Sequence, residues 1–441
     1  MPSRRILACA VAVGVLGQPV VVLAGTFDYS LYGGVEHSNN IALSSDAPAS
    51  SNVLIPGANF TYLQQGSVFQ ANVLGTIEYH KYTNSDFDNQ TQTQLAGQVN
   101  WTVLPDRLDF ALEDYAGVQP VDTLSSNAPD NQQQTNVLTL GPTLRLRFSD
   151  AMRGQVDLRY INSYASKVDD FNSSRGLVAG RLFRTISPTD EFSLNAEHQR
   201  VTFDNGDTGS NYSRDEAFVR YTSTLAHFDA DVLVGWTHLD FDRGPSAASK
   251  PLARLSLGWT PSTHTSFNLS GAYQYADAAQ DLSQPLGQQT IDELVPTGVG
   301  TGSGIATGNV VIDSGVYLER LLEANYRYNG TRFALSVSPL YRRLNYVVDA
   351  TFDQTGRGGS VRWDYRPRPT VTLSVFGTGE RLQYDRLART DKTWRYGADI
   401  RQQMTPHWSW TASLIRQTRQ SNAAQQSYRE TEVFFSVVYR R

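Results

Sequence analysis

Two pairs of side chains have the composition of a hydrolytic site. Asp86 and Asp88 are separated by one residue, and so are His238 and Asp240. A carboxylate beside an imidazole can take a proton from water and activate it for attack. Aspartate is also common in solvated loops, which is the simpler explanation of both pairs. We therefore keep a hydrolytic site at the rim of the molecule as the less favoured interpretation and do not expect an enzyme.

Cofactor and metal chemistry has no support in the sequence. The seven histidines show no spacing typical of metal ligands, and neither a phosphate-binding glycine loop nor a nucleophile elbow is present. The formal net charge is −5, which gives no general affinity for polyanions. We expect no cofactor, no bound metal and no nucleic-acid partner.

Arginine is the main cation of the chain, since lysine occurs only at positions 81, 167, 250 and 392. The guanidinium group forms paired hydrogen bonds with carboxylates, so it suits both ion pairs and anionic solutes. Acidic residues share the polar face of the arginine-bearing segments, among them Asp157 and Asp399. We favour ion pairs that stiffen a wall, and keep as the alternative a path for an anionic solute such as a uronate-bearing polysaccharide. The arginines expected to line a lumen are Arg145, Arg147, Arg159, Arg220, Arg254, Arg362, Arg381 and Arg401.

Alternation of apolar and polar residues indicates the elements that position these arginines. In segment 266–275, Phe267 and Leu269 lie on one face of an extended chain and Asn268 and Gln274 on the other. Similar runs of about 10 to 14 residues recur along the chain, whereas strands of soluble proteins average about 5 to 6. A tilted strand needs about 9 to 11 residues to cross a bilayer. The pattern predicts membrane-spanning strands with an apolar outer face and a wet inner face.

Turn signals divide the chain at regular intervals. Tight turns alternate with longer polar loops, as in outer-membrane barrels with short periplasmic turns. Nine turns and ten loops predict an all-β fold, a transmembrane up-and-down antiparallel β-barrel of 20 strands. Eighteen strands is the alternative, because 31–59 and 315–353 are difficult to divide. The turns are expected at Gln65-Gly66, Pro105-Asp106, Ser149-Asp150, Pro188-Thr189, Ala226-His227, Pro261-Ser262, Asn329-Gly330, Pro367-Arg368 and Pro406-His407.

A repeat of about 40 residues also occurs in β-propellers. A propeller needs four short strands in each repeat, whereas each repeat here holds two long ones. We favour the barrel over a propeller, and over a soluble sandwich or solenoid. The interval 278–315 is unusually long, and loops of this length are often functional. Either it folds inward as a constriction or plug, or it stays outside the barrel.

Tryptophan positions fit a membrane boundary. Amphipathic rings gather at the interface between lipid and water, where barrels carry aromatic girdles. The alternative is that these rings fill strand ends in a soluble core. The residues expected in a girdle, each within four residues of a tight turn, are Trp101, Trp259, Trp363, Trp408 and Trp410.

The first residues have the form of a secretory signal peptide. Arg4 and Arg5 precede an apolar stretch that ends at Ala24, a small residue suited to cleavage. We expect a signal peptide at 1–24 and an outer-membrane barrel at 25–441. The single cysteine, Cys9, falls in the expected signal peptide, so we expect no disulfide in the mature chain.

Three stretches resemble a known family. The aromatic-rich segment 27–45 contains the step Asn40-Ile41-Ala42-Leu43, and segments 56–82 and 104–117 follow. Together they resemble the exosortase (PEP-CTERM)-associated outer-membrane β-barrels, the β-barrel porin 2 group, which are encoded beside exopolysaccharide gene clusters. The chain departs from barrels that end in an aromatic residue, because Arg440 and Arg441 follow Tyr439.

The resemblance implies a role in polysaccharide secretion or surface assembly. We expect an outer-membrane channel in a Gram-negative bacterium that conducts an exopolysaccharide. The expected partners are outer-membrane lipid and lipopolysaccharide, the polysaccharide, periplasmic or inner-membrane export components, and the barrel-assembly machinery. A general diffusion porin for small solutes is the alternative, and a plugged structural barrel or a rim hydrolase is less favoured.

Overall fold

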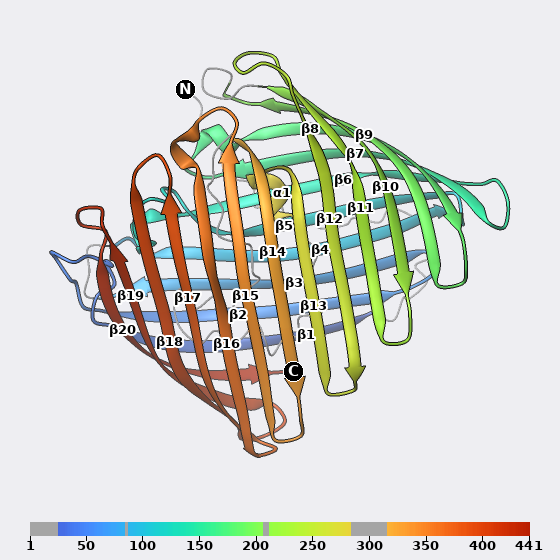
Figure 1. Ribbon diagram of the computed structural model, residues 1–441. Helices are drawn as coiled ribbons and strands as arrows, with labels where there is room; N and C mark the ends of the chain where they lie inside the picture. Colours follow the sequence, from blue (N-terminus) through green and yellow to red (C-terminus); the bar gives the residue numbers. More distant parts are fainter. Residues whose placement is uncertain (1–24, 84–86, 206–210, 284–314) are drawn as a thin grey trace, which may run out of the picture.

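The chain folds into a closed β-barrel (Figure 1). The computed structural model describes residues 25–83, 87–205, 211–283 and 315–441, and in them 20 strands form one sheet. Each strand pairs antiparallel with its neighbours in sequence, and β1 (Thr26–Ser38) pairs with β20 (Tyr428–Arg440) to complete the ring. The prediction of 20 strands is confirmed and the alternative of 18 is wrong. The expected signal peptide lies outside the described residues.

The remaining strands are long enough to cross a bilayer at a tilt, as the alternation predicted. None of the helices in the described segments has the length and apolar character of a membrane span. Between β1 and β20 the strands are β2 (Ser51–Gln65), β3 (Phe69–Tyr82), β4 (Gln90–Leu104), β5 (Leu108–Pro120), β6 (Gln132–Arg147), β7 (Met152–Ala165), β8 (Ser173–Thr185), β9 (Asp190–Phe203), β10 (Tyr212–Thr224), β11 (Phe228–Phe241), β12 (Ala248–Ser262), β13 (Thr265–Asp277), β14 (Val316–Asn329), β15 (Phe333–Tyr346), β16 (Gln354–Arg368), β17 (Val371–Tyr384), β18 (Arg389–Gln403) and β19 (Trp408–Ser421). The helices are α1 (Ala278–Leu282) and the 3-10 turns η1 (Pro129–Asn131), η2 (Asp169–Phe171) and η3 (Ala350–Phe352).

The two ends of the barrel differ. One end, here called the turn end, carries the start of β1, the end of β20 and nine connections of two to four residues. Each predicted turn lies within two residues of one of these connections. Asp106 in the β4–β5 turn has a φ of 59°, a conformation that aspartate tolerates better than most residues. The opposite end, here called the loop end, carries ten connections, nine of them of six residues or more, including α1 and the 3-10 turns.

Side chains alternate between the two faces of the wall. On β17, Val375 is 52% exposed whereas its neighbour Ser374 is 1% exposed. The faces of β13 are as predicted at Phe267, which is exposed beside Trp259, and at Gln274, which is buried within the barrel. At the loop end of this strand the prediction fails, because Tyr275, expected on the outer face, is buried in a cluster with Tyr212. The outer surface is rich in exposed Leu, Val, Phe, Tyr and Trp, so it suits lipid rather than water.

The predicted girdle tryptophans gather near the turn end. Trp101, Trp259, Trp363 and Trp408 are exposed on the outer face, and the ring of Trp410 lies 6.1 Å from that of Phe435. Two further tryptophans on the outer face lie closer to the loop end and were not in the predicted set, namely Trp236 and Trp394.

The inner and outer faces can be distinguished on adjacent residues of β14. Leu322 is exposed on the outer face, whereas Glu323 is exposed on the inner face. We expect Glu323→Cys to react quickly with a charged, water-soluble thiol reagent, and Leu322→Cys to be protected in vesicles until detergent is added. Mass spectrometry of the labelled protein measures both rates, with the unsubstituted chain as the blank. Fast aqueous labelling of Leu322→Cys in vesicles would contradict a membrane-spanning wall.

Candidate functional site

The lumen wall is lined by ion-paired arginines. Seven of the eight predicted arginines lie on inward faces, opposite the exposed apolar side chains. Arg220 Nε donates to Asp231 at 2.7 Å, and Arg362 Nε lies 2.9 Å from Asp364. The favoured interpretation, pairing that stiffens the wall, fits this arrangement. The other ion pairs among them are Arg145 with Asp109, Arg147 with Asp150, Arg159 with Asp157 and Arg254 with Glu216; Arg401 is also inward.

Arg381 does not line the lumen, which corrects the prediction. It lies on the same face of β17 as the exposed Val375, and Glu380 takes the inward position. Side chains alternate with a period of two along a strand, so every second residue from Val375 faces outward. The prediction followed the charge of Arg381 instead of this count.

The long loop after β13 begins inside the barrel. Its first turn, α1, is held by two carboxylates, each of which accepts from an arginine and a tyrosine. Asp277 accepts from Arg175 Nη1 and from the hydroxyl of Tyr212, both at 2.6 Å. Asp281 pairs with Arg342 and accepts from the hydroxyl of Tyr317 at 2.5 Å. These partners come from β8, β10, β15 and β14, so α1 is tied to widely separated parts of the wall.

The apolar side of α1 packs against the far side of the ring. Ala278, Ala279 and Leu282 form a buried cluster with Val137 of β6 and Phe171 of η2. Strands β6 and β13 are seven positions apart in the ring, so α1 reaches across the lumen at the loop end (Figure 1). Of the two arrangements expected for 278–315, inward folding holds for its described start; residues 284–314 lie outside the described part of the chain.

A second loop also reaches across the loop end. Between β5 and β6, the carbonyl oxygen of Leu124 accepts from Arg389 Nη2 at 2.6 Å and that of Ser125 accepts from Arg419 Nη1 at 3.1 Å. Asp391 holds both arginines, with Nη2 of each within 2.9 Å of Oδ2. Loop 121–131 and α1 together form a constriction, which we call the loop-end constriction.

The lumen wall closer to the turn end offers unused amide groups. A cavity of about 720 Å³ lies against the inner faces of β3 to β7. Within the described residues, the side chains of Gln70, Asn72 and Asn100 form no hydrogen bonds to protein, so both their donors and their acceptors are available. Polar alternation puts each of these amides on the inner face of its strand, and the register of β3 with β4 sets Gln70 directly opposite Asn100.

The described residues of the less favoured hydrolytic site do not come together. Asp88 lies at the lumen mouth beside Gln132 and Lys167, whereas His238 faces outward and bonds Ser249 at 2.8 Å. Asp240 is on the same outward face as His238, and Asp86 lies outside the described residues. In the described segments, no group of three or more His, Cys, Asp or Glu has the geometry to hold a metal ion.

Burial makes the carboxyl group of Asp281 a weaker acid than usual. Removal from water raises the pKa of this carboxyl from 3.8 to about 6, even though Arg342 opposes the shift and Glu319 adds to it. A carboxyl with a raised pKa takes up a proton as its site forms. Proton uptake by Asp281 therefore stabilises the docked position of α1. This stabilisation is fully present below pH 4 and is lost as the pH rises through about 6.

Comparison with protein-family models gives no match, and comparison with curated proteins gives none. Solved structures with similar folds include the ferric enterobactin receptor PfeA of Pseudomonas aeruginosa, which is 9% identical, with a TM-score of 0.48 and coverage of 95% of this chain and 80% of the other. A BenF-like porin from Pseudomonas fluorescens Pf-5 is 9% identical, with coverage of 95% and 99% and a TM-score of 0.40. Pseudomonas aeruginosa OpdK, solved with vanillate, is 8% identical, with coverage of 95% and 99% and a TM-score of 0.38. Similarity at this level assigns no function to the chain.

We expect proton uptake by Asp281 to tighten the loop-end constriction. The single-channel conductance of the wild type in a planar bilayer should fall as the pH is lowered from 7.5 to 5. Asp281→Asn, which cannot ionise, should keep the low-pH conductance throughout this range. An identical pH profile in both proteins would contradict the role of this carboxyl.

Release of loop 121–131 should widen the channel. The double variant Arg389→Ala, Arg419→Ala removes the arginine donors to Leu124 and Ser125, so we expect higher conductance than in the wild type at neutral pH. Arg220→Gln is the matched control, because it removes an inward arginine near the turn end that touches neither loop. Equal conductance in the double variant and the wild type would show that the loop does not limit flow.

Proposed function

We propose that this protein is an outer-membrane channel that conducts a hydroxyl-rich polymer, an exopolysaccharide. The observation that carries the proposal is the wall of unpaired amides in a closed, wet barrel. Amide groups both donate and accept hydrogen bonds, so they can follow a chain of sugar hydroxyls without binding any single unit tightly. A barrel of this size is too wide for its own side chains to fill, which leaves room for water and solute.

The charges beside the amides support a neutral or weakly acidic polymer. Arg145 and Arg159 line the same cavity, but Asp109 and Asp157 neutralise them. A strong anion path would need cations without such partners. We therefore assign recognition to hydrogen bonds from Gln70, Asn72 and Asn100, with the paired arginines as secondary contacts.

The loop-end constriction favours a linear polymer over unselective diffusion of small solutes. Two inward segments, α1 and loop 121–131, narrow the mouth, which favours an extended chain and restricts bulky molecules. We place the barrel in the outer membrane of a Gram-negative bacterium, with the loop end outside and the turn end in the periplasm. Export components at the periplasmic side and the barrel-assembly machinery are the partners we propose, and no catalytic role.

Block of ion flow by sugars tests this proposal. Glucose oligomers and uronic-acid oligomers of equal length, added at the turn end, should both reduce the single-channel conductance. The triple variant Gln70→Ala, Asn72→Ala, Asn100→Ala should need at least about 10-fold more oligomer for half block, because each lost hydrogen bond contributes about 0.5–1.5 kcal/mol. Arg220→Gln, on another part of the wall, should behave as the wild type.

The alternative, a diffusion porin for small solutes, predicts a different result. The proposal of a polymer channel would be overturned by ohmic conductance that stays the same when either kind of oligomer is added, in both the wild type and the triple variant. Block by the uronic-acid oligomers alone would favour the anion path instead.

A further inference from the structure

Basic residues form a row on the outside of the barrel. Five consecutive strands each carry one outward-facing cation within a few residues of the loop end. Other outward residues of the same strands are apolar, such as Leu322, Val361 and Val375. The members of this outer basic row are Arg320 (β14), Arg343 (β15), Arg357 (β16), Arg381 (β17) and Lys392 (β18).

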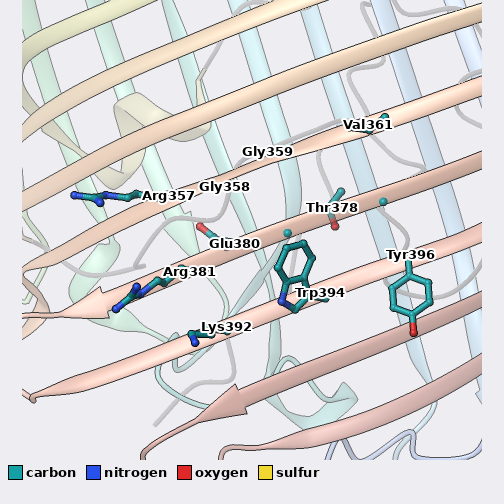
Figure 2. A pocket seen from close by; sticks show the side chains of 12 residues that line it. Arg357, Gly358, Gly359, Val361, Thr378, Glu380, Arg381, Lys392, Trp394 and Tyr396 are labelled. Atoms are coloured by element: carbon teal, nitrogen blue, oxygen red, sulfur yellow. The ribbon is translucent and has the colours of Figure 1, made fainter.

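The register places these cations side by side. Arg320 pairs directly with Arg343, Arg357 with Arg381, and Arg381 with Lys392. Directly opposed residues of an antiparallel pair have their Cβ atoms about 4.5–5.5 Å apart. Figure 2 shows Arg357, Arg381 and Lys392 next to one another on three neighbouring strands.

Cations that lie this close together need a nearby anion to offset their mutual repulsion. Directly opposed like charges destabilise a sheet, and the cost grows where the surroundings exclude water. Among the described residues, no carboxylate pairs with Arg357, Arg381 or Lys392. Arg343 has only a longer contact, 3.5 Å from Asp385 at the loop end. The centre of the row therefore holds three adjacent cations without a protein counter-ion.

The same level on another part of the wall shows the opposite arrangement. On β9, the outward Arg200 pairs with Asp242, and the outward His198 bonds Asp215 of β10 at 2.6 Å. Outward charges there are compensated within the protein. The uncompensated cations at the centre of the outer basic row thus differ from the outward charges of β9.

A shallow groove runs from the centre of the row toward the middle of the wall. Its volume is about 720 Å³, and it is bordered by Val361, Trp394 and Tyr396. Gly377 and Gly379 form its floor on the outer face of β17, and the ring of Trp394 lies over Gly379 (Figure 2). The groove thus has a cationic head and an apolar body.

We propose that this surface binds a phosphorylated, acylated glycolipid of the outer leaflet, of the lipid A type. Its phosphates accept hydrogen bonds from Arg357, Arg381 and Lys392, and an acyl chain lies in the groove beside Trp394. Guanidinium and ammonium groups are the usual partners of phosphate. The row lies where the headgroups of the outer leaflet meet the wall when the loop end faces outward.

Native mass spectrometry of the detergent-purified barrel tests this binding. The probes are diphosphorylated lipid A, its dephosphorylated form and phosphatidylglycerol. We expect the wild type to retain diphosphorylated lipid A, and the triple variant Arg357→Gln, Arg381→Gln, Lys392→Gln to retain at least about 10-fold less, since each lost bond is charge-assisted. Arg200→Gln is the matched control and should retain as much as the wild type.

The outcomes separate the sources of the phosphate. Equal retention by the triple variant and the wild type would overturn the site. Wild-type binding of phosphatidylglycerol as tightly as lipid A would overturn the glycolipid assignment, as would equal binding of the dephosphorylated form. Migration of unheated and heated samples on a gel reports whether each variant is a folded barrel.

A second variant tests the groove without touching a charge. An added Cβ at Gly377 meets only the Cβ of Tyr396 at 3.8 Å, so a side chain fits there without strain. Gly377→Leu fills the groove and should lower the retention of hexa-acylated lipid A while the barrel stays folded. Unchanged retention in this variant would overturn the placement of the acyl chain.

Discussion

The structure depends on one constraint, the pairing of every backbone N–H and C=O group that lies in hydrocarbon. An unpaired group there costs several kcal/mol, and an open sheet would leave two strands with free edges. The pairing of β1 with β20 from Ser30–Arg440 to Ser38–Glu432 removes both edges. Once the ring is closed, strand length follows from bilayer thickness, and the period of two sorts side chains into a lipid face and a water face. All polar chemistry is then confined to the lumen, to the two ends and to the headgroup level of the outer wall.

Closure also creates a problem that the loops solve. A ring this wide cannot be filled by its own side chains, so its mouth would be open without additional structure. Loop 121–131 and α1 narrow it, and both are held by carboxylates and arginines instead of a large apolar core. Buried ion pairs are costly unless every partner is present, and removal of one partner costs about 3–5 kcal/mol. Asp277 and Asp281 each accept from one arginine and one tyrosine, so neither charge is left without compensation.

The sequence was sufficient for the properties that repeat locally. Strand number and turn positions follow from alternation and turn residues, each visible within a few positions. The inward arginines were predicted correctly wherever residues were counted along the strand with a period of two. Arg381 was assigned without this count, and its predicted position was wrong. The bridge made by α1 could not be predicted, because Arg175 and Asp277 are 102 residues apart and meet only through the curvature of the whole ring. The free amides of the lumen wall were missed for the same reason, since Gln70 and Asn100 become neighbours only in the register of β3 with β4.

The contacts of Arg342 with Asp281 and Glu319, here called the inner clamp, lie on the same strands as part of the outer basic row. Together the two features constrain the register of these strands. On β14, Glu319 faces inward and Arg320 outward; on β15, Arg342 faces inward and Arg343 outward. A slip of one residue on either strand would exchange these faces. A slip on β15 would move Arg342 away from Asp281, so the clamp on α1 would be lost. A slip on β14 would place Glu319 among the cations at the headgroup level. Alternate charges of this kind make the correct register the only one that satisfies both faces.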